Sequence, residues 1–232
     1  MSGFHKIVIQ NLSADTTQFY VFQQPAVIAA NRINQSVTST SLGTGTVLPY
    51  DQSGTELVFK FDVEFLVGAY SNQTTASQTR IVLAPLVQSS LESSWPITLT
   101  PSTDGTEVDN SSNLSPQPLG LSKPAYEPGV PEGNFAIQVP SYTPMAGVDL
   151  FCGTAVKDDK GGITLSSYIT PPPVSSVFCA PVAKYYIKVG SEAAGNIITF
   201  STRNAALCDF TTGFSTCNVS YNADGSFIVT GK

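Results

Sequence analysis

The chain of 232 residues is sparingly charged and acidic: 12% of its residues are Asp, Glu, Lys or Arg, and the formal net charge is −6. This balance argues against nucleic acid as a partner, because phosphate binding needs a basic face and the 11 Lys and Arg are scattered. There is no apolar run of the roughly eighteen residues typical of a membrane-spanning helix. All-β domains often reach about 200–250 residues, so we expect a single domain over residues 1–232.

The clearest predicted strand covers residues 57–67. Leu57, Phe59 and Phe61 begin an alternation of apolar side chains that continues to Val67, as in a strand with one buried face. Pro85 interrupts another apolar run and indicates an edge strand or a bend there. Further strands in this part of the chain are predicted at residues 6–10, 18–22 and 80–87.

Residues 89–133 are dense in Ser, Pro, Asp, Asn and Gly, and their apolar residues gather around Trp95, Leu119 and Tyr126. This composition predicts a long irregular excursion from the domain. Long loops inside a compact domain are often functional, so one interpretation is a lid over a pocket. A glycosylated surface loop without a role in chemistry is the other.

From residue 135 the strand pattern resumes. Asp224-Gly225 is a strong hairpin signal, because glycine readily adopts the positive φ that a tight turn needs. Pro171-Pro172-Pro173 indicates an extended crossover, since proline has no N–H to donate to a strand ladder. The predicted strands cover residues 135–139, 148–152, 163–169, 184–189, 197–200, 218–221 and 226–230.

Short strands separated by turn signals predict an all-β fold. We expect two packed antiparallel sheets, a β-sandwich of the jelly-roll kind, with a closed lipocalin-like barrel as the second candidate. The 16 prolines and the many β-branched and aromatic residues leave little room for helix.

Asn-x-Ser/Thr sequons and paired cysteines favour a secreted protein or one of the secretory-pathway lumen. Because the first residues lack a basic segment followed by an apolar one, we expect that a signal peptide has been removed. The sequons that predict N-glycosylation are at Asn11, Asn34, Asn72, Asn110, Asn113 and Asn218.

The four cysteines predict disulfide bonds. Cys208 and Cys217 flank a short loop that a strand pair would close, which leaves Cys152 and Cys179 as a second pair. The sequence does not fix this connectivity, and four buried free thiols are the alternative. Neither a Cys-x-x-C motif nor a Cys/His cluster is present, so no zinc site is expected.

Few residues are suited to acid–base, metal or cofactor chemistry. His5 is the only histidine and no Gly-x-Ser-x-Gly motif accompanies it, so no hydrolytic triad is expected. Asp62 and Glu64 would share a strand face at a spacing near that of an inverting glycosidase pair. The neighbouring Lys60 favours a solvated surface, and catalytic carboxylates usually converge from different elements across a cleft. Asp158-Asp159 precedes two glycines and favours a turn over a calcium site. We expect no metal and no cofactor.

Aromatic residues are numerous, with 13 Phe, nine Tyr and one Trp. They would be enough to line an apolar ligand pocket that holds a few polar groups, such as Arg80, Gln23 or a tyrosine hydroxyl. An ordinary apolar core is the simpler interpretation for any one of them.

Several segments share their residues with one known family. Near the N-terminus, Ile9-Gln10-Asn11 is followed by Thr17-Gln18-Phe19-Tyr20-Val21-Phe22-Gln23-Gln24-Pro25, which ends in a Phe-x-x-Pro pattern. The most specific part is Ala180-Pro181-Val182-Ala183-Lys184-Tyr185-Tyr186-Ile187-Lys188-Val189-Gly190, between the three prolines and Gly195. Together with the run 61–71 and the closing Asp224-Gly225 hairpin, these segments resemble a family of small secreted fungal β-sandwich proteins, many of them encoded beside natural-product genes.

Some members of this family are hetero-Diels-Alderases that join a tropolone-derived quinone methide to a humulene-type sesquiterpene alcohol. The resemblance implies a cofactor-independent pericyclase, acting on polyketide- and terpene-derived apolar substrates. For such a reaction we expect a hydrogen-bond donor from Arg80, Tyr70 or Tyr168. We expect Trp95, Phe65 and Phe178 to form the apolar walls and Gln23 to bind substrate.

Two other functions remain open from the sequence. A carbohydrate- or small-ligand-binding β-sandwich without catalysis would show a shallow row of aromatic side chains. A structural or cell-surface protein would show a filled core and no pocket above a few hundred Å³.

Overall fold

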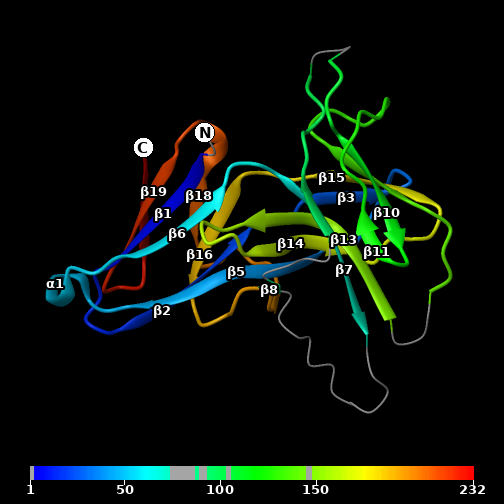
Figure 1. Ribbon diagram of the computed structural model, residues 1–232. Helices are drawn as coiled ribbons and strands as arrows, with labels where there is room; N and C mark the ends of the chain where they lie inside the picture. The colour runs from blue at the N-terminus through cyan, green and yellow to red at the C-terminus, as the bar shows by residue number, and fades with distance from the viewer. Residues whose placement is uncertain (1–2, 74–86, 89–92, 103–105, 145–147) are drawn as a thin grey trace.

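The computed structural model describes residues 3–73, 87–88, 93–102, 106–144 and 148–232. In these residues nearly all regular structure is β, as predicted, and the strands form three sheets (Figure 1). The helical segments are the single turns α1 (Tyr50–Ser53) and η1 (Phe210–Thr212). The all-β prediction is therefore confirmed, and the sheets pack face to face as in a sandwich.

The ten-stranded sheet forms the base of the molecule. Its path runs through β18 (Ala206–Asp209), β16 (Lys184–Val189), β2 (Thr17–Gln23), β5 (Thr38–Val47), β14 (Ile163–Ile169), β13 (Val148–Lys157), β7 (Leu66–Gln73) and β9 (Ser93–Pro96). Two short strands join it at the side, β17 (Ile197–Ile198) against β5 and β8 (Val87–Gln88) against β14.

Two smaller sheets complete the fold. The four-stranded sheet has the order β20 (Phe227–Gly231), β19 (Thr216–Tyr221), β1 (Phe4–Asn11) and β6 (Leu57–Asp62). The six-stranded sheet has the order β11 (Leu119–Leu121), β10 (Ser111–Pro116), β12 (Phe135–Val139), β15 (Ser175–Ala180), β3 (Val27–Ala30) and β4 (Ile33–Asn34). The pairs β1–β19 and β10–β12 are parallel, so the architecture differs from the expected pair of antiparallel sheets.

The main apolar cores lie beside each other along the ten-stranded sheet. The first core packs the six-stranded sheet against β7 and β13, with Ile137, Val177, Val67 and Leu150 among its members. The second core packs the four-stranded sheet against β2, β5 and β16 and includes Ile7, Val219, Phe19, Leu42 and Ile187. Each smaller sheet thus covers its own part of the base.

A third apolar group lies on the other face of β13. Along this strand Leu150 and Cys152 belong to the first core, whereas the intervening Phe151 packs against the third group. Because successive side chains of a strand point to opposite faces, the third group is on the back of the sheet. We call it the Tyr168 cluster; it contains Leu66, Tyr70, Ala155, Leu165 and Tyr168.

The predicted strand at residues 57–67 is in fact two strands in two sheets. β6 ends at Asp62 in the four-stranded sheet, and β7 begins at Leu66 in the ten-stranded sheet. The Asp62 side chain makes this break, because its Oδ1 accepts a hydrogen bond from the Glu64 N–H at 3.2 Å and so turns the backbone. The alternation of apolar residues continues through residues 63–65, so it gave no sign of the turn between the two strands.

The segment 89–133 was expected to be irregular, but part of it belongs to the fold. Strands β10 and β11 complete the six-stranded sheet, and Leu114 and Leu121 are buried in the first core. The rest of the segment includes the projection at the top of Figure 1. Leu121 also accepts a hydrogen bond from Trp95 Nε1 at 2.9 Å, which ties β9 to β11.

The hairpin predicted at Asp224-Gly225 is present. It joins β19 to β20, and Gly225 has a φ of 82°. The Asp224 carboxylate accepts hydrogen bonds from the backbone N–H and the hydroxyl of Ser226, which fix the turn. The three prolines 171–173 lie between β14 and β15, where the chain crosses from the ten-stranded to the six-stranded sheet.

Candidate functional site

Tyr70 and Tyr168, two predicted hydrogen-bond donors, lie together in the Tyr168 cluster. Tyr168 is 2% exposed, and its ring meets that of Phe151 edge-on with a centroid distance of 5.1 Å. Burial raises the pKa of Tyr168 to about 12, so the hydroxyl keeps its proton at neutral pH. The third predicted donor, Arg80, lies outside the described residues.

The residues predicted to bind substrate do not gather around one cavity. Phe65 packs against the first core, and Phe178 is half-buried on β15 of the six-stranded sheet. Trp95 is 39% exposed on β9. The Gln23 side chain is buried and donates to the Val182 carbonyl at 2.9 Å, so it ties the end of β2 to the loop between β15 and β16.

A pocket lies where the β10–β11 turn approaches the ends of β7 and β13. Its volume is about 740 Å³. We call it the Tyr142 pocket. Its apolar lining comes from Pro116, Pro118, Leu119, Pro144, Val148 and Leu150, and its polar lining from Ser71, Gln117, Ser141, Tyr142, Thr143, Asp149 and Thr170.

The Tyr142 pocket carries hydroxyl groups and little charge. Asp149 is the one carboxylate among its lining residues, and it is exposed to solvent. The Tyr142 hydroxyl donates to the Pro171 carbonyl, and burial raises the pKa of this tyrosine. The lining holds hydroxyl donors and apolar surface, but no acid–base pair.

Strand geometry separates the Tyr142 pocket from the predicted tyrosines. In the β13–β7 ladder Leu150 is opposite Ser71, and both line the pocket. The next pair, Phe151 and Tyr70, points to the other face of the sheet. Tyr70 and Tyr168 therefore do not reach this pocket. The sequence signal for this pocket is Pro140-Ser141-Tyr142-Thr143-Pro144, an aromatic residue in a proline-flanked loop, and it is too short and too common a pattern to indicate a site by itself.

All four cysteines are buried free thiols in the structure, and they lie as two pairs. Cys152 on β13 and Cys179 on β15 belong to facing sheets of the first core and interact electrostatically. Cys208 on β18 and Cys217 on β19 are in hydrogen-bond contact. Burial raises the pKa of Cys152 to about 12. The pairing expected from the sequence matches these neighbours, while the disulfide bonds themselves remain a prediction.

The asparagines of the sequons differ in whether their side chains are exposed enough to carry a glycan. The Asn11 amide is buried and donates to the carbonyls of Asp15 and Val47, at 2.7 and 3.2 Å. Asn110 is also buried and donates to Thr100 and Glu127. A glycan on either nitrogen is incompatible with these bonds. Asn34 and Asn113 are exposed and Asn218 is half-buried, whereas the side chain of Asn72 lies outside the described part of the structure.

The other candidate groups form no catalytic centre. Asp62 is buried at the end of β6 and Glu64 is exposed beyond it, so the two do not face a common cleft. Asp158 Oδ1 accepts from the backbone N–H groups of Lys160 and Gly162, which is the predicted turn. Among the described residues, no three His, Cys, Asp or Glu side chains are grouped closely enough to hold a metal ion.

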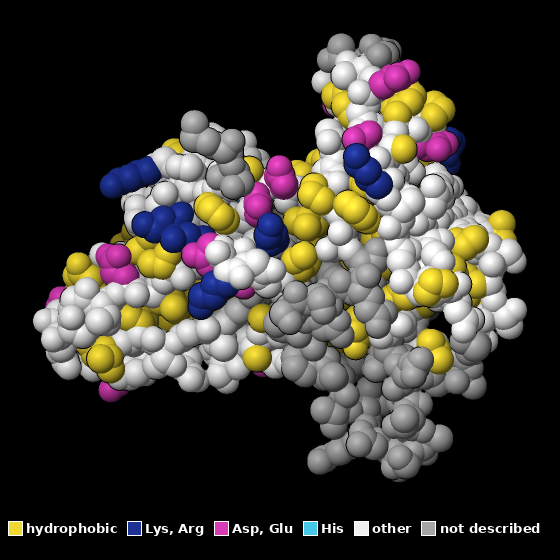
Figure 2. Space-filling model, in the orientation of Figure 1, with side chains coloured by type: hydrophobic (Ala, Val, Ile, Leu, Met, Phe, Trp, Pro, Cys, Tyr) yellow, Lys and Arg dark blue, Asp and Glu magenta, His cyan; other side chains and the backbone are white. Residues whose placement is uncertain are grey.

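Figure 2 shows how charge is distributed on one face of the molecule. Lys, Arg, Asp and Glu side chains gather mostly on the side of β1, β6 and β19 and on the projection, while the right-hand margin is almost entirely apolar or neutral. No helix in the described residues is both long and apolar enough to span a bilayer. The chain matches no protein-family model, no curated protein and no solved structure.

Proposed function

We propose that the protein binds uncharged, largely apolar small molecules in the Tyr142 pocket and orients them for a cofactor-independent cycloaddition of the hetero-Diels-Alder type. The observation that supports this is a cavity of about 740 Å³ whose lining consists of apolar groups, hydroxyls, the Gln117 amide and one exposed carboxylate, Asp149, without an acid–base pair. Cavities of about 300–1,000 Å³ suit small-molecule ligands. The sequence resemblance supplies the reaction class.

The reaction needs orientation more than proton transfer. A heterodiene and an alkene form two σ bonds while three π bonds become one, and no proton moves. Leu119, Val148 and Leu150 would hold the apolar faces of the two reactants together. Well-oriented pairs gain effective molarities of up to about 10⁵–10⁸ M, an upper bound of about 7–11 kcal/mol.

A hydrogen bond to the heterodiene oxygen adds to this effect, because negative charge builds on that oxygen in the transition state. In the Tyr142 pocket this donor is a hydroxyl of Ser141, Thr143 or Thr170, in place of Arg80 or the two tyrosines predicted from the sequence. Tyr142 is a positioning residue: its hydroxyl is engaged with Pro171, so it anchors the loop and presents its ring.

The test is a reaction of the protein with a quinone-methide precursor and a terpene alkene, followed by chiral chromatography. The protein is expected to raise both the rate and the stereoselectivity over buffer alone. Leu119→Trp, which fills the pocket from a half-buried position, is expected to lower the rate by at least about tenfold. Leu207→Trp is the matched control, because Leu207 is exposed on β18, away from the pocket.

A rate and product ratio equal to those in buffer would contradict catalysis. If titration calorimetry then still showed binding of either reactant, and Leu119→Trp abolished it, the second candidate function would stand: a small-ligand-binding sandwich without catalysis. The same pocket supports that function, since its lining is suited to neutral ligands. We further propose a secretory-pathway location, supported by the exposed sequons at Asn34 and Asn113 and by the paired cysteines.

A further inference from the structure

A second hollow lies where the chain passes from β2 to β3, and it shares no lining residue with the Tyr142 pocket. It is an open groove with a volume of about 530 Å³. We call it the Tyr186 groove. Tyr186 and Phe200 supply its aromatic surface, and Gln24, Asn34, Gln35 and Thr202 its polar groups, while the rest of the lining is apolar.

The aromatic surface is a packed platform. Tyr186 on β16 stacks on Phe22 of the neighbouring β2, with a centroid distance of 5.5 Å and an interplanar angle of 17°. Phe200 stands edge-on to both rings, at 5.7 Å from Tyr186 and 5.9 Å from Phe22. Phe22 is fully buried, whereas Phe200 is 37% exposed. The buried ring fixes the platform and Phe200 offers its surface to a ligand.

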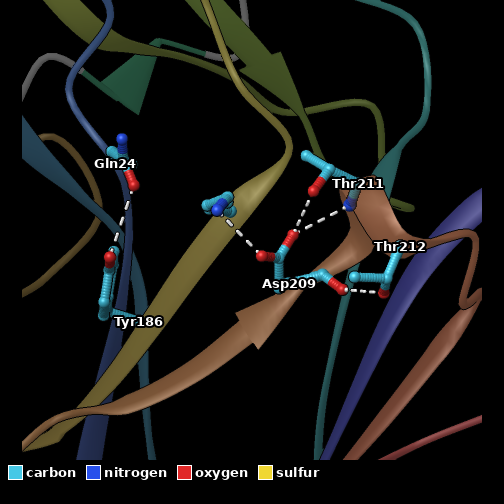
Figure 3. Close-up of polar contacts among 6 residues, drawn as sticks. Gln24, Tyr186, Asp209, Thr211 and Thr212 are labelled. Carbon is cyan, nitrogen blue, oxygen red and sulfur yellow. Dashed lines mark hydrogen bonds and ion pairs between the residues drawn. The ribbon is translucent and has the colours of Figure 1, made fainter.

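The amide side chains beside the platform are oriented by the protein. Gln24 Oε1 accepts from the Tyr186 hydroxyl at 3.3 Å, so the Gln24 amide presents its N–H groups (Figure 3). Gln35 Nε2 donates to the Ile33 carbonyl at 2.9 Å, which leaves its Oε1 as an acceptor. The groove therefore offers a donor and an acceptor next to an exposed ring.

The lining of the Tyr186 groove contains no Asp, Glu, Lys, Arg or His. Lys184, two residues before Tyr186 on β16, is paired with Asp209 at 2.9 Å, so its charge is already balanced. A phosphate, a nucleotide or a charged peptide would leave its charge without a partner here. A purely apolar ligand would leave the amides unsatisfied.

From these features we infer that the Tyr186 groove binds a neutral oligosaccharide. A pyranose ring presents C–H groups on one face, which suit the negative face of an aromatic ring, and hydroxyls at its edge, which suit side-chain amides. The groove is open to solvent, so a bound sugar chain has room to extend out of it. This site is separate from the pocket of the proposed function and stands independently of it.

The experiment uses the full chain produced without N-glycosylation, because Asn34 is both a groove residue and an exposed sequon. Cellohexaose, mannohexaose and chitohexaose are titrated into the protein by calorimetry, with a sialylated and a sulfated oligosaccharide as charged probes. At least one neutral hexasaccharide is expected to bind and neither charged probe is. Absence of binding by all three at millimolar concentration, or binding of a charged probe alone, would overturn the inference.

Variants locate the binding. Phe200→Ala and Gln24→Leu are each expected to weaken the affinity by tenfold or more. Phe214→Ala is the matched control, since Phe214 is also exposed, at 42%, but outside the groove. Far-UV circular dichroism verifies that each variant is folded. Equal affinity of Phe200→Ala and the native chain would refute the site. Leu119→Trp is expected to keep oligosaccharide binding, so the proposals for the Tyr142 pocket and the Tyr186 groove are tested independently of each other.

The fully glycosylated protein supplies a second measurement. If the glycan of Asn34 itself occupies the groove, its removal with an endoglycosidase would open the site, and the added hexasaccharide would bind only afterwards. That result supports a saccharide site. Binding that is unchanged by a glycan shown by mass spectrometry to be attached at Asn34, and unchanged by Phe200→Ala, would count against it.

Discussion

Gly153 shows how one residue permits close strand pairing in the base of the molecule. It lies on β13 opposite Tyr168 of β14 and Gly68 of β7. A Cβ atom at this position would lie 2.1 Å from the carbonyl oxygen of Ser167 and 2.8 Å from the Cα atom of Tyr168. Both are backbone atoms, which side-chain rotation cannot move, so only glycine fits here.

Gly153→Ala is therefore expected to destabilise the protein by at least about 1–3 kcal/mol, the usual cost of overpacking, and to disturb the pairing of β13 with β14. Gly120→Ala is the control, because a Cβ at that strand position has open space around it. Urea denaturation monitored by circular dichroism gives both values. Equal midpoints for the two variants would contradict the clash.

His5, the single histidine of the chain, is half-buried near the start of β1. Its ring stacks on Phe210 with a centroid distance of 4.4 Å, lies 6.0 Å from the Tyr185 ring, and leaves Nδ1 without a hydrogen-bond partner. Burial lowers the pKa of His5, and the nearby Asp62 opposes this only in part. The neutral form is thus favoured in the folded state.

Because the folded pKa is below the unfolded value of 6.5, the unfolded chain takes up the proton first as the pH falls. The stabilisation by neutral His5 is complete above pH 6.5 and is lost as the pH falls through that value and the lowered folded pKa. We expect the melting temperature of the native chain to fall more than that of His5→Gln between pH 7.5 and 5.5. If the melting temperatures of the two proteins fell equally over this pH range, His5 would not contribute to the pH dependence of stability.

At the scale of single residues, the sequence predicted a residue's structural role only where that role depends on residues next to it in the chain. Asp224-Gly225 predicted its hairpin, because the turn is made by the residues themselves. The environments of Tyr70 and Gln23 depend on which strands lie beside them. Tyr70 faces the back of the sheet, and Gln23 is held by a carbonyl 159 positions away, so neither role followed from residue type.

At the scale of elements, the first core lies between strands of two different sheets that are far apart in the sequence. Cys152 on β13 and Cys179 on β15 are both fully buried between the ten-stranded and six-stranded sheets. A bond between them would connect the two layers covalently. Since disulfides typically contribute about 2–4 kcal/mol, the gain would be a large share of the stability of a domain.

Refolding in a glutathione redox buffer is therefore expected to produce the Cys152–Cys179 disulfide and to raise the melting temperature relative to the reduced protein. Peptide mapping identifies the bond, and thiol titration in denaturant counts the cysteines that stay free. Cys152→Ala should lose this gain, whereas Cys208→Ala should keep it. Four titratable thiols after refolding would contradict the prediction.

The single strand predicted at residues 57–67, which is β6 and β7 in the structure, shows what sequence periodicity does not predict. Alternation marks which side chains of β6 and β7 are apolar, but Phe61 enters the second core and Val67 the first. Only the Asp62–Glu64 turn separates the two destinations. A period of two predicts strands well and says nothing about which sheet receives them.

At the scale of the whole molecule, both main cores depend on one sheet. The four-stranded and six-stranded sheets pack on different parts of the ten-stranded sheet, and β5 extends from β2 to β14 across its centre (Figure 1). The sequence predicted the all-β class from composition and periodicity. The third sheet was not predictable, because pairings such as parallel β1–β19 join residues more than 200 positions apart.

We expect the two cores to unfold together. Leu42→Ala removes a side chain from the second core and should cost about 2–5 kcal/mol. Trp95, the single tryptophan, lies on β9 at the other end of the sheet. Its fluorescence transition should shift as far as the transition seen by circular dichroism. A Trp95 transition that stays at the native midpoint in this variant would show that the halves unfold independently.

The position of β5 has a consequence for errors in folding. Its C-terminal residues pair with β2 from Thr17 to Phe22, and its N-terminal Thr38 and Ser39 pair with β14. A slip of one residue in a strand exchanges its two faces. In β5 such a slip would displace Leu42 from the interior and at the same moment misplace Thr40, whose hydroxyl donates to the Leu165 carbonyl. A misregistered molecule would therefore lose the packing of Leu42 and the hydrogen bond of Thr40 together, so the penalty for a slip in β5 is double.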